Sequence, residues 1–401
     1  MTATIIPAPL RGAVRAIASK SAAHRLLICA AFADAETEIV CPDTSKDIEA
    51  TIDCLNSLGA GIVRRGTSLF VSPIAGTRKN AALDCGESGS TLRFMLPVCC
   101  ALGAGASIRM HGRLPERPLS PLWEELTAHG AEISHPERET LLISGAASGR
   151  DWSIDGGVSS QFVSGILFSL PLIGGGELAV TGRAESSGYI DMTVSAMLKF
   201  GVNVVKTERG YAVSGAYRTP GRAEVEGDWS NAAFWLAAAE LCGGEVTCTG
   251  LDDASGQGDR AVRDILPALG GGCVVDARDI PDLVPILAVT ASLRRGDTTF
   301  INAGRLRLKE SDRISSTCAM INSLGGSAEE TADGIAVHGT GSLCGGTVDS
   351  CGDHRIAMCA AIASIGCTGR VRVLGAECTQ KSYPQFWRDF ADLGGKVSME
   401  D

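Results

Sequence analysis

MLKFGVNVVKTERGYAVS, residues 197–214, joins the end of an apolar helix to a glycine and then to short alternating strands. Gly201 stands where a helix needs a left-handed residue before the chain turns into a strand. Relatives of this phrase recur along the chain, and their glycines are Gly59, Gly130, Gly201, Gly270, Gly325 and Gly394. The successive gaps are 71, 71, 69, 55 and 69 residues. Spacing this even indicates six copies of one α/β unit.

A second phrase precedes each glycine phrase, and it is a small or polar opening followed by an alanine-rich apolar run. Examples are SKSAAHRLLICAAFA, DGGVSSQFVSGILFSLPL and CGDHRIAMCAAIASI. Each predicts a helix that begins on Gly, Ser or Asp and is buried nearly all round. The shorter gap of 55 residues argues against a uniform solenoid. We therefore expect two clusters of three units, with a break near residues 217–229.

Composition bounds the class of protein. The chain has 401 residues, of which 45% are hydrophobic, and this is enough for packed cores in two or three domains. No apolar run approaches the ~18 residues of a membrane span, and the first residues lack a signal-peptide pattern. Fifteen cysteines are scattered through apolar stretches without a CxxC pair, which favours reduced thiols in a cytoplasmic protein. A formal charge of −10 argues against nucleic acid or a membrane as partner, so an anion site must be a local concentration of Lys and Arg.

Charged and polar residues collect where the buried helices open. Lys20, Ser21 and Arg25 open the first, Arg93 lies in the second, Ser159, Ser160 and Gln161 open the third, Asp282 opens the fifth, and Asp353, His354 and Arg355 open the sixth. The helix dipole disfavours cations at this end by roughly 0.3 to 1 kcal/mol each, so they call for an anionic partner. An interdomain salt-bridge network with Asp282, Glu310, Asp312 and Asp353 is one explanation. A polyanionic small molecule held between domains is the other explanation. The recurrence of charged and polar residues at five helix openings favours this second explanation.

RLRLKESDRIS, residues 305–315, places six charged residues in nine positions. Ser311 and Asp312 suit a helix N-cap, and acids suit the positive end of the dipole. This segment therefore predicts a solvated helix start, or charges that face a ligand.

Taken together, the motifs resemble the enolpyruvyl transferase superfamily, and within it the 3-phosphoshikimate 1-carboxyvinyltransferase family, also called 5-enolpyruvylshikimate-3-phosphate synthase. The motifs that carry this resemblance recur in the family's order over essentially the whole chain: SKSAAHR, ERPLSPL, DGGVSSQF, ESSGYIDMT, EGDWSNAAF, IPDLVP, LRLKESDRI, GDHRIAM and KSYPQF. The resemblance implies an α/β fold of two domains, each made of three βαβαββ units, with the active site in the cleft between them. One domain would be discontinuous, with residues 1–17 joining 226–401, and the other would be the inserted segment 18–225.

The resemblance also implies the reaction. The family transfers the enolpyruvyl group of phosphoenolpyruvate to the 5-hydroxyl of shikimate 3-phosphate and releases phosphate, as a step of the shikimate pathway toward chorismate and the aromatic amino acids. It needs no metal or organic cofactor, it is mostly monomeric, and glyphosate inhibits it at the phosphoenolpyruvate site. Both substrates carry a phosphate and a carboxylate, which accounts for a basic site on an acidic protein.

Carried over position by position, the resemblance assigns two sets of binding residues. The shikimate 3-phosphate set is Lys20, Ser21, Arg25, Ser159, Ser160, Gln161, Ser186, Tyr189, Asp282 and Lys309. The phosphoenolpyruvate set is Lys20, Gly89, Arg117, Gln161, Arg313, Arg355 and Lys381. Serine hydroxyls donate to phosphate oxygens and the arginine fork suits a carboxylate, while a glycine such as Gly89 lets backbone approach a ligand closely.

The chemistry requires two proton transfers around a tetrahedral phospho-ketal. One group takes the proton of the 5-hydroxyl, and another protonates the methylene carbon of phosphoenolpyruvate and recovers that proton as phosphate leaves. Asp282 and Glu310 are the candidates, in either order, with Lys20 assisting. We interpret Asp312 as a helix cap or as a partner of a neighbouring cation, and leave the role of Arg305 open.

One position departs from the family pattern. Glu87, in CGESGST, stands where the family usually has Asn, so an extra carboxylate lies close to Gly89. It either weakens anion binding or pairs with a local arginine such as Arg93. Glyphosate sensitivity depends on the same loop and is left open.

Two rival functions remain. The sister transferase that acts on UDP-N-acetylglucosamine has a related fold, but it opens on Lys-Asn where this chain has Lys20-Ser21, and it usually carries a reactive Cys in the loop that reads HGRLPERPLSPL here. A non-catalytic scaffold or anion-binding module would keep the glycines but would not need Asp282 together with Glu310.

Overall fold

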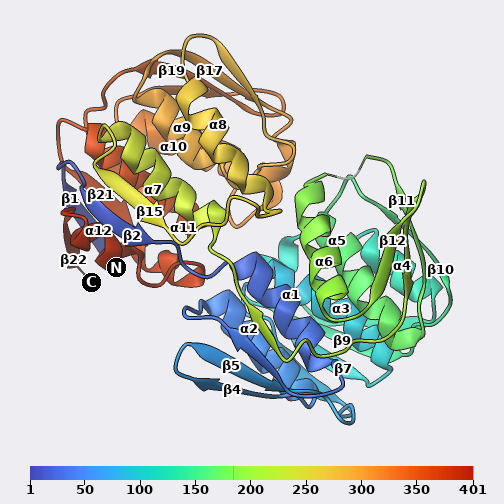
Figure 1. Ribbon diagram of the computed structural model, residues 1–401. Helices are drawn as coiled ribbons and strands as arrows, with labels where there is room; N and C mark the ends of the chain where they lie inside the picture. The colour runs from blue at the N-terminus through green and yellow to red at the C-terminus, as the bar shows by residue number, and fades with distance from the viewer. Residues whose placement is uncertain (184, 401) are drawn as a thin grey trace. The chain divides into compact units, whose positions relative to one another are not determined.

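The computed structural model describes residues 1–183 and 185–400. The chain forms two compact units. Unit 1 consists of Met1–Ile17 with Gly227–Asp401, and unit 2 is the continuous segment Ala18–Glu226. In Figure 1, unit 2 runs from blue through green, whereas unit 1 combines the blue first strands with the yellow to red second half of the chain. Within the described part of the chain, no helix is long and apolar enough to cross a membrane.

Unit 2 contains three four-stranded sheets and the helices that connect their strands. Its strands are β3 (Thr37–Val40), β4 (Gly61–Arg65), β5 (Ser68–Ser72), β6 (Ala81–Asp84), β7 (Ala106–Arg109), β8 (Ala131–Glu137), β9 (Thr140–Gly145), β10 (Asp151–Asp155), β11 (Gly176–Thr181), β12 (Asn203–Lys206), β13 (Gly210–Ser214) and β14 (Arg222–Glu224). Its helices are α1 (Lys20–Ala31), α2 (Lys46–Leu58), α3 (Gly89–Leu102), α4 (Leu122–Ala128), α5 (Ser160–Ser169) and α6 (Ser187–Lys199), with short 3-10 turns at Leu114–Glu116 and Leu170–Ile173.

The three sheets of unit 2 share one topology. Their strand orders are β14-β3-β5-β4, β6-β7-β9-β8 and β10-β11-β13-β12. In each sheet the first two strands are parallel, and a hairpin adds two antiparallel strands. The sheet that follows α1 is completed by β14, the last strand of the unit, which pairs in parallel with β3. This is the βαβαββ pattern that the sequence resemblance implied.

Unit 1 is built on the same plan. Its strands are β1 (Thr2–Ile6), β2 (Gly12–Arg15), β15 (Val246–Thr249), β16 (Cys273–Asp276), β17 (Arg295–Ile301), β18 (Ser327–Glu330), β19 (Ile335–Thr340), β20 (Gly346–Asp349), β21 (Val371–Leu374) and β22 (Lys396–Glu400). Its helices are α7 (Trp229–Leu241), α8 (Val262–Ile265), α9 (Val284–Ser292), α10 (Arg313–Ser323), α11 (His354–Ala363) and α12 (Phe386–Asp392), with 3-10 turns at Gly258–Ala261, Leu266–Ala268, Gly304–Leu308, Ser364–Gly366 and Ala376–Lys381. The four-stranded sheets have the orders β16-β17-β19-β18 and β20-β21-β1-β22. Strand β1 therefore takes the place of the second hairpin strand in the last sheet, between β21 and β22.

The fourth unit is shorter than expected. Its sheet has only the parallel pair β15-β2 within the described residues, so the structure has six units as expected, and the fourth of them lacks the hairpin. After Gly270 the chain enters β16 directly, and β16 pairs with β17 in the next sheet. The hairpin β18–β19 of that next unit spans Ser327–Thr340, which is 14 residues, and 14 is also the difference between the gaps of 69 and 55. Loss of one hairpin accounts for the irregular spacing.

The recurrent glycines adopt the backbone conformation that was predicted. Their φ angles are +117° at Gly59, +101° at Gly130, +77° at Gly201, +90° at Gly270, +83° at Gly325 and +93° at Gly394. Only glycine adopts these values without strain, so each ends its helical segment and releases the chain toward a strand.

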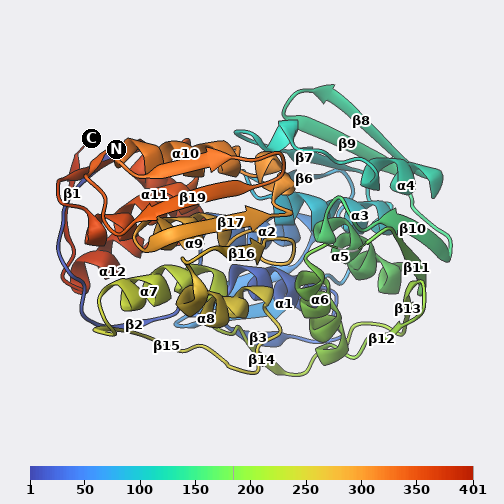
Figure 2. The same ribbon diagram turned by 90° about the horizontal axis from the view of Figure 1, so that it is seen from above.

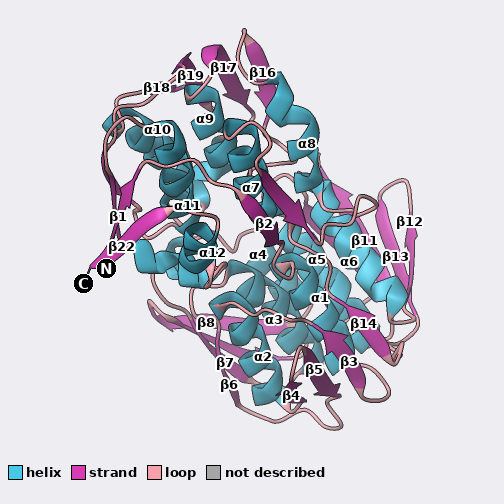
Figure 3. Ribbon diagram, turned by 60° about the vertical axis from the view of Figure 1, so that its left-hand side comes forward, coloured by secondary structure: helices cyan, strands magenta, loops and turns pink. Residues whose placement is uncertain are grey.

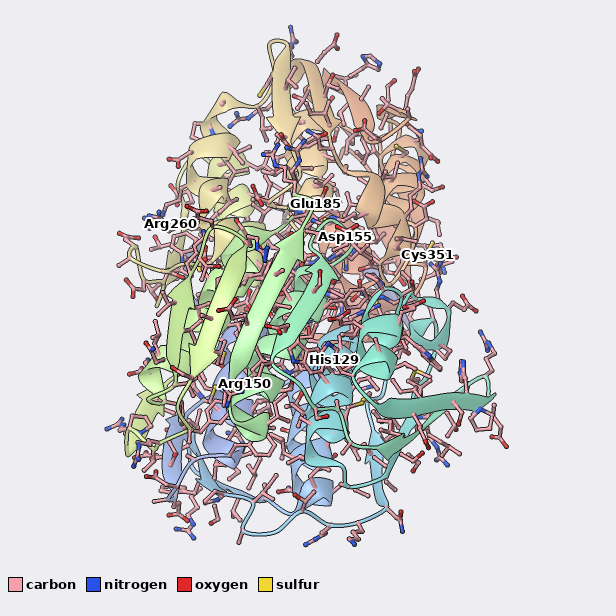
Figure 4. All side chains as sticks on the ribbon, turned by 90° about the vertical axis from the view of Figure 1, so that its right-hand side faces the viewer. His129, Arg150, Asp155, Glu185, Arg260 and Cys351 are labelled. Carbon is pink, nitrogen blue, oxygen red and sulfur yellow. The ribbon has the colours of Figure 1, made fainter. Side chains whose placement is uncertain are left out.

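The helices that were predicted to be buried form the centres of the two units. Every residue of α9 and α11 is buried, and α1, α3, α5 and α7 are buried along most of their lengths. Figures 2 and 3 show the helices gathered inside each unit and the strands toward its outside. Neighbouring repeats are joined by contacts such as that of His129 (labelled in Figure 4), which follows α4 and stacks on Trp152 of β10 with ring centroids 3.7 Å apart. This packing fixes the helix openings, where the candidate residues lie.

Candidate active site

Lys20 is the first residue of α1 in unit 2. The hydroxyl of Ser19 caps this helix by accepting a hydrogen bond from the Ala22 N–H at 3.3 Å. Lys20 Nζ donates to Asp47 Oδ2 at 2.9 Å, and Asp47 is buried in the first turn of α2, where the dipole favours an acid. Lys20 remains 20% exposed, so its ammonium is paired but accessible. Asp47 was not among the predicted residues, although its place at the start of a polar helix was visible in the sequence.

Arg25 is buried in unit 2, and among the described residues it contacts no carboxylate. Its Nε donates to Thr193 Oγ1 at 2.8 Å, and its two Nη atoms donate to the carbonyl oxygens of Ser21 at 2.6 Å and Tyr189 at 2.8 Å. Its guanidinium carbon lies 5.2 Å from the centre of the Phe94 ring. Burial lowers the pKa of Arg25 to about 10, so it is still charged at neutral pH. A buried cation with neutral partners attracts an anion.

Gly89 begins α3 between two guanidinium groups. A Cβ atom at this position would stand 2.6 Å from Nη1 of Arg93 and 2.7 Å from Nη1 of Arg117. Arg93 donates to Pro118 O at 3.1 Å, which ties it to the loop that carries Arg117. The Nε of Arg117 is buried and makes no hydrogen bond to any described residue. The helix N-terminus and the two arginines together form a concentration of positive charge.

The opening of α5 brings the predicted Ser159, Ser160 and Gln161 to the same helix end. Ser159 caps α5 by accepting a hydrogen bond from the Gln161 N–H at 3.2 Å. The Gln161 side chain bridges to α3, since Nε2 donates to Ser90 Oγ at 2.9 Å and Oε1 accepts from Arg93 Nη1 at 3.3 Å. Gln161 therefore connects the serines of α5 to the arginines around Gly89.

Ser186 and Tyr189 lie at the start of α6. Ser186, which follows Glu185 (labelled in Figure 4), has φ +53° and ψ 46°, a left-handed conformation that is costly for a residue other than glycine. The Tyr189 carbonyl accepts from both Arg25 and Thr193. The backbone of α6 thereby holds Arg25 in place.

In unit 1, Arg313 is the centre of an ionic cluster. This residue begins α10, it is 1% exposed, and it donates to three carboxylates. Nε donates to Asp353 Oδ2 at 2.7 Å, Nη1 to Asp282 Oδ1 at 2.7 Å and Nη2 to Glu310 Oε2 at 2.6 Å. Burial opposes its charge, but Asp353, Glu310 and Asp282 outweigh burial and raise the pKa of Arg313 well above its ordinary value. Three of the four acids of the interdomain network considered from the sequence therefore pair with Arg313 inside unit 1: Asp282, Glu310 and Asp353.

Asp282 links Arg313 to further cations. Its Oδ1 lies 3.4 Å from Lys309 Nζ, and its Oδ2 lies 3.5 Å from Arg355 Nη2. Burial disfavours its charged form, yet Lys309, Arg355 and Arg313 overcome burial and hold the pKa of Asp282 well below its ordinary value. Burial lowers the pKa of Lys309 to about 8, with Asp282 opposing that effect. Asp282 is thus an ionised carboxylate, and Lys309 is close to its titration range.

Glu310 and Lys381 extend the cluster. Lys381 Nζ lies 3.9 Å from Glu310 Oε1, and both side chains are largely buried, being 10% and 12% exposed. All six predicted residues of unit 1 therefore form one connected group: Asp282, Lys309, Glu310, Arg313, Arg355 and Lys381. Among the residues that the structure describes, no three His, Cys, Asp or Glu side chains are placed to hold a metal ion.

Asp312 has both of the structural roles that were proposed for it. Its Oδ1 caps α10 by accepting from the Ser315 N–H at 3.1 Å, and its Oδ2 accepts from Arg307 Nη1 at 2.9 Å. Arg305 donates to the carbonyl of Arg278 at 3.0 Å. The dense charge of residues 305–315 thus divides into a cap with its partner and a buried ionic cluster.

At the start of α11, Asp353 is the N-cap and accepts from the Arg355 N–H at 2.9 Å. His354 is buried, and neither of its ring nitrogens has a hydrogen-bond partner among the described residues. Burial lowers the pKa of His354 to about 3, so its imidazole is neutral.

Ser230 and Asp259 also adjoin this cluster, and neither was among the predicted site residues, although the motif EGDWSNAAF contains Ser230. Arg355 Nη2 donates to Ser230 Oγ at 2.5 Å. Burial raises the pKa of Asp259 to about 6, whereas Arg355 and the Ser230 hydroxyl oppose this rise. Asp259 lies in the 3-10 turn Gly258–Ala261, within an irregular segment that has no periodic pattern. No motif in that segment pointed to the site.

Glu87 is exposed on the loop before α3. A Cβ atom on Gly112 would stand 2.8 Å from the Glu87 carboxyl carbon, so this side chain packs against the turn that follows β7. The extra carboxylate is thus placed at the surface of the loop.

The fold is similar to that of solved structures of EPSP synthase. Two solved structures of EPSP synthase from Acinetobacter baumannii match this chain. One has a TM-score of 0.80 at 22% identity and covers 99% of this chain and 100% of the other. The second has a TM-score of 0.81 at 20% identity and covers 100% of both chains.

Sequence comparison identifies the family. The model of the family EPSP synthase (3-phosphoshikimate 1-carboxyvinyltransferase) matches residues 5–277 and 272–390. The 3-phosphoshikimate 1-carboxyvinyltransferase of Clostridium acetobutylicum is 39% identical over 417 residues, covering 98% of this chain and 97% of the relative. That of Clostridium perfringens strain 13 is 39% identical over 421 residues, covering 99% of each chain. The chain belongs to the EPSP synthase family, as its motifs indicated.

Proposed function

We propose that this protein transfers the enolpyruvyl group of phosphoenolpyruvate to the 5-hydroxyl of shikimate 3-phosphate and releases phosphate. Membership of the EPSP synthase family over nearly the full chain supports this activity. One observation carries the binding assignments: Arg25 is buried, and its hydrogen bonds to the described residues go only to carbonyl and hydroxyl oxygens. Such a cation is suited to an anionic substrate.

The proposed shikimate 3-phosphate set combines residues of both units. In unit 2 these are Lys20, Ser21, Arg25, Ser159, Ser160, Gln161, Ser186 and Tyr189, and in unit 1 they are Asp282 and Lys309. The serine hydroxyls at the capped start of α5 and before α6 can donate to phosphate oxygens, and the ammonium groups of Lys20 and Lys309 supply charge. The domain division proposed from the sequence has residues 18–225 in one domain and residues 1–17 and 226–401 in the other. It divides this set of binding residues in the same way as units 2 and 1 do.

The proposed phosphoenolpyruvate set consists of Lys20, Gly89, Arg117, Gln161, Arg313, Arg355 and Lys381. In unit 2 it is supported by the N–H groups of α3 and by the unbonded Nε of Arg117, which can donate to a carboxylate or phosphate. In unit 1 the arginines already face carboxylates, so the substrate's anionic groups compete with Asp282 and Glu310 for them.

This competition suggests how the proton transfers proceed. The group that takes the proton of the 5-hydroxyl must be ionised beforehand, and the low pKa of Asp282 supports that role for it. When the substrate's anionic groups engage Arg313, Arg355 and Lys309, Asp282 loses part of its cationic surroundings and becomes more basic. Glu310 then exchanges the proton with the methylene carbon, and Lys20 stabilises the charge that develops.

We further propose that the protein acts as a cytoplasmic monomer without a cofactor. All fifteen cysteines are free thiols, and burial raises the pKa of many of them, including Cys99 and Cys359, which suits a reducing compartment. The molar mass in solution, from light scattering, tests the monomer.

The activity is tested by phosphate release from purified protein with both substrates, with each substrate omitted in turn. We expect release only when both are present and no metal is added. An Arg117→Lys variant should lose most of its affinity for phosphoenolpyruvate, because a lysine lacks the planar fork of donors. Arg113→Lys, at a 51% exposed residue of the same loop, is the matched control and should behave as wild type. A folded wild-type protein that releases no phosphate would contradict the proposal, and UDP-N-acetylglucosamine would then replace shikimate 3-phosphate in the assay.

A further inference from the structure

Thr51 of α2 is hydrogen-bonded to two other helices of unit 2. Its Oγ1 lies 2.7 Å from His24 Nδ1 of α1 and 2.7 Å from Thr91 Oγ1 of α3. All three side chains are completely buried. A threonine inside a helix can donate back to a carbonyl of its own helix, as Thr290 of α9 does to Ile286 O at 2.9 Å. The two hydrogen bonds of Thr51 instead leave its helix, so this hydroxyl joins α1 to α3.

The hydrogen bonds continue from Thr91 to the cap of α3. Thr91 Oγ1 donates to Ser88 Oγ at 2.7 Å, and the Thr91 N–H donates to the same oxygen at 3.2 Å. Ser88 is the N-cap of α3 and is completely buried, and the next residue is Gly89. Thr91 Oγ1 also donates to Asp47 O at 3.4 Å, and the Asp47 side chain accepts from Lys20 at 2.9 Å. The starts of α1, α2 and α3 are therefore tied together by hydrogen bonds.

These hydrogen bonds have one direction. The single proton of the Thr91 hydroxyl is directed at Ser88 and Asp47, so Thr51 must donate to Thr91. The proton of Thr51 is then used, so Thr51 accepts in turn from His24, and the imidazole carries its hydrogen on Nδ1. Burial lowers the pKa of His24 to about 3, so the ring is neutral and has one N–H. Its Nε2 is buried with no hydrogen-bond partner among the described residues, a place where a lone pair is tolerated better than an N–H.

We propose that this chain of buried hydrogen bonds positions the start of α3 relative to the start of α1. We call it the threonine chain, and it consists of His24, Thr51, Thr91 and Ser88. Lys20 begins α1 and Gly89 begins α3, so the chain holds in register two members of the proposed phosphoenolpyruvate set. The role rests on the proposed function, in which Lys20 and Gly89 bind that substrate. The four residues of the chain act through these two, and they are positioning residues.

The direction of the threonine chain is tested by the imidazole nitrogen signals in an NMR spectrum of the wild-type protein. A His24→Asn variant identifies which signals belong to His24. At neutral pH we expect a hydrogen on Nδ1 and a lone pair on Nε2. The opposite tautomer would overturn the chain, because Thr51 would then donate to His24 and could not donate to Thr91. This measurement needs no substrate, so it remains valid if the proposed function fails.

The positioning role is tested by steady-state kinetics. Thr51→Val keeps the shape of the side chain without its hydroxyl, and we expect KM for phosphoenolpyruvate to rise about tenfold while kcat and KM for shikimate 3-phosphate change less than about threefold. Thr51→Ser supplies a hydroxyl again and should return KM for phosphoenolpyruvate to within about threefold of wild type. Thr91→Val breaks the same chain but keeps the N–H that Ser88 accepts, so combining it with Thr51→Val should add no more than about twofold.

Thr290→Val is the matched control, because Thr290 is equally buried but donates to its own helix. It should behave as wild type in both KM values. Thermal unfolding identifies any variant that fails to fold, and Thr91→Val together with the tautomer of His24 keeps the test open if Thr51→Val does not fold. An unchanged KM for phosphoenolpyruvate in Thr51→Val, equal rises in both KM values, or no recovery in Thr51→Ser would overturn the proposal. A folded wild type without activity counts against the proposed function instead.

Discussion

Gly89 and Arg117 are packed so closely that a single methyl group would separate them: a Cβ on Gly89 would lie 2.7 Å from Arg117 Nη1. The same atom would lie 2.6 Å from Arg93 Nη1. Both guanidinium groups are thus held against the N-terminus of α3, where the helix dipole adds to their charge.

Gly89→Ala should therefore displace the two arginines. We expect KM for phosphoenolpyruvate to rise about tenfold, with KM for shikimate 3-phosphate nearly unchanged, because only the former substrate is assigned to this helix end. Gly76→Ala is the matched control in unit 2, since nothing lies within 4 Å of its added Cβ. Unchanged kinetics in Gly89→Ala would mean that these arginines do not bind phosphoenolpyruvate.

Glu87→Asn should keep its activity, because the carboxylate is exposed and packs against the turn at Gly112. Removing one negative charge from the loop before α3 should leave KM for phosphoenolpyruvate the same or lower it slightly. Initial-rate measurements at fixed ionic strength test this. A rise of about tenfold would show instead that Glu87 supports the binding of this substrate.

Asp282→Ala should lower kcat by roughly 100-fold or more, the usual contribution of a general base, while calorimetry still detects substrate binding. Asp312→Asn is the appropriate control on the neighbouring helix, because asparagine also caps helices and Asp312 contacts Arg307 rather than the cluster. Full turnover in Asp282→Ala would remove this residue from the proton transfers.

Binding of shikimate 3-phosphate should weaken above pH 8. Burial lowers the pKa of Lys309 from 10.5 to about 8, so in the free enzyme its charged form is present below pH 8 and is lost as the pH rises. KM for shikimate 3-phosphate should then rise by up to about tenfold per pH unit. Lys309→Arg should flatten this profile up to pH 9, because a guanidinium stays charged. A wild-type profile that is already flat would indicate that Lys309 does not bind this substrate.

Much of the fold could be predicted from the sequence because it depends on local rules. The glycines end their helices in the left-handed conformation because other residues are strained there, and Asp312 caps α10 because its side chain reaches the N–H groups of its own helix. The truncated fourth unit was visible only as a gap of 55 residues, because spacing shows that something is missing but not which strands.

The parts of the site that escaped prediction depend on distant contacts. Lys20 pairs with Asp47 across 27 positions, and Arg25 is held by Thr193 and Tyr189 more than 160 positions away. Asp259 lies in a short 3-10 turn without a periodic pattern, so nothing in the sequence indicated that it would be buried. A sequence pattern identifies residue types that suit a reaction, but not which acid neutralises which cation.

The placement of β1 between β21 and β22 has a consequence for biosynthesis. While the ribosome extends the chain, unit 2 can complete all three of its sheets once residue 224 has emerged, since β14 is the last strand that it needs. Strand β1 is made first, but its hydrogen-bonding partners are residues 371–374 and 396–400. The earliest strand of the chain must therefore wait for the latest ones, and unit 2 should be folded before unit 1 is complete.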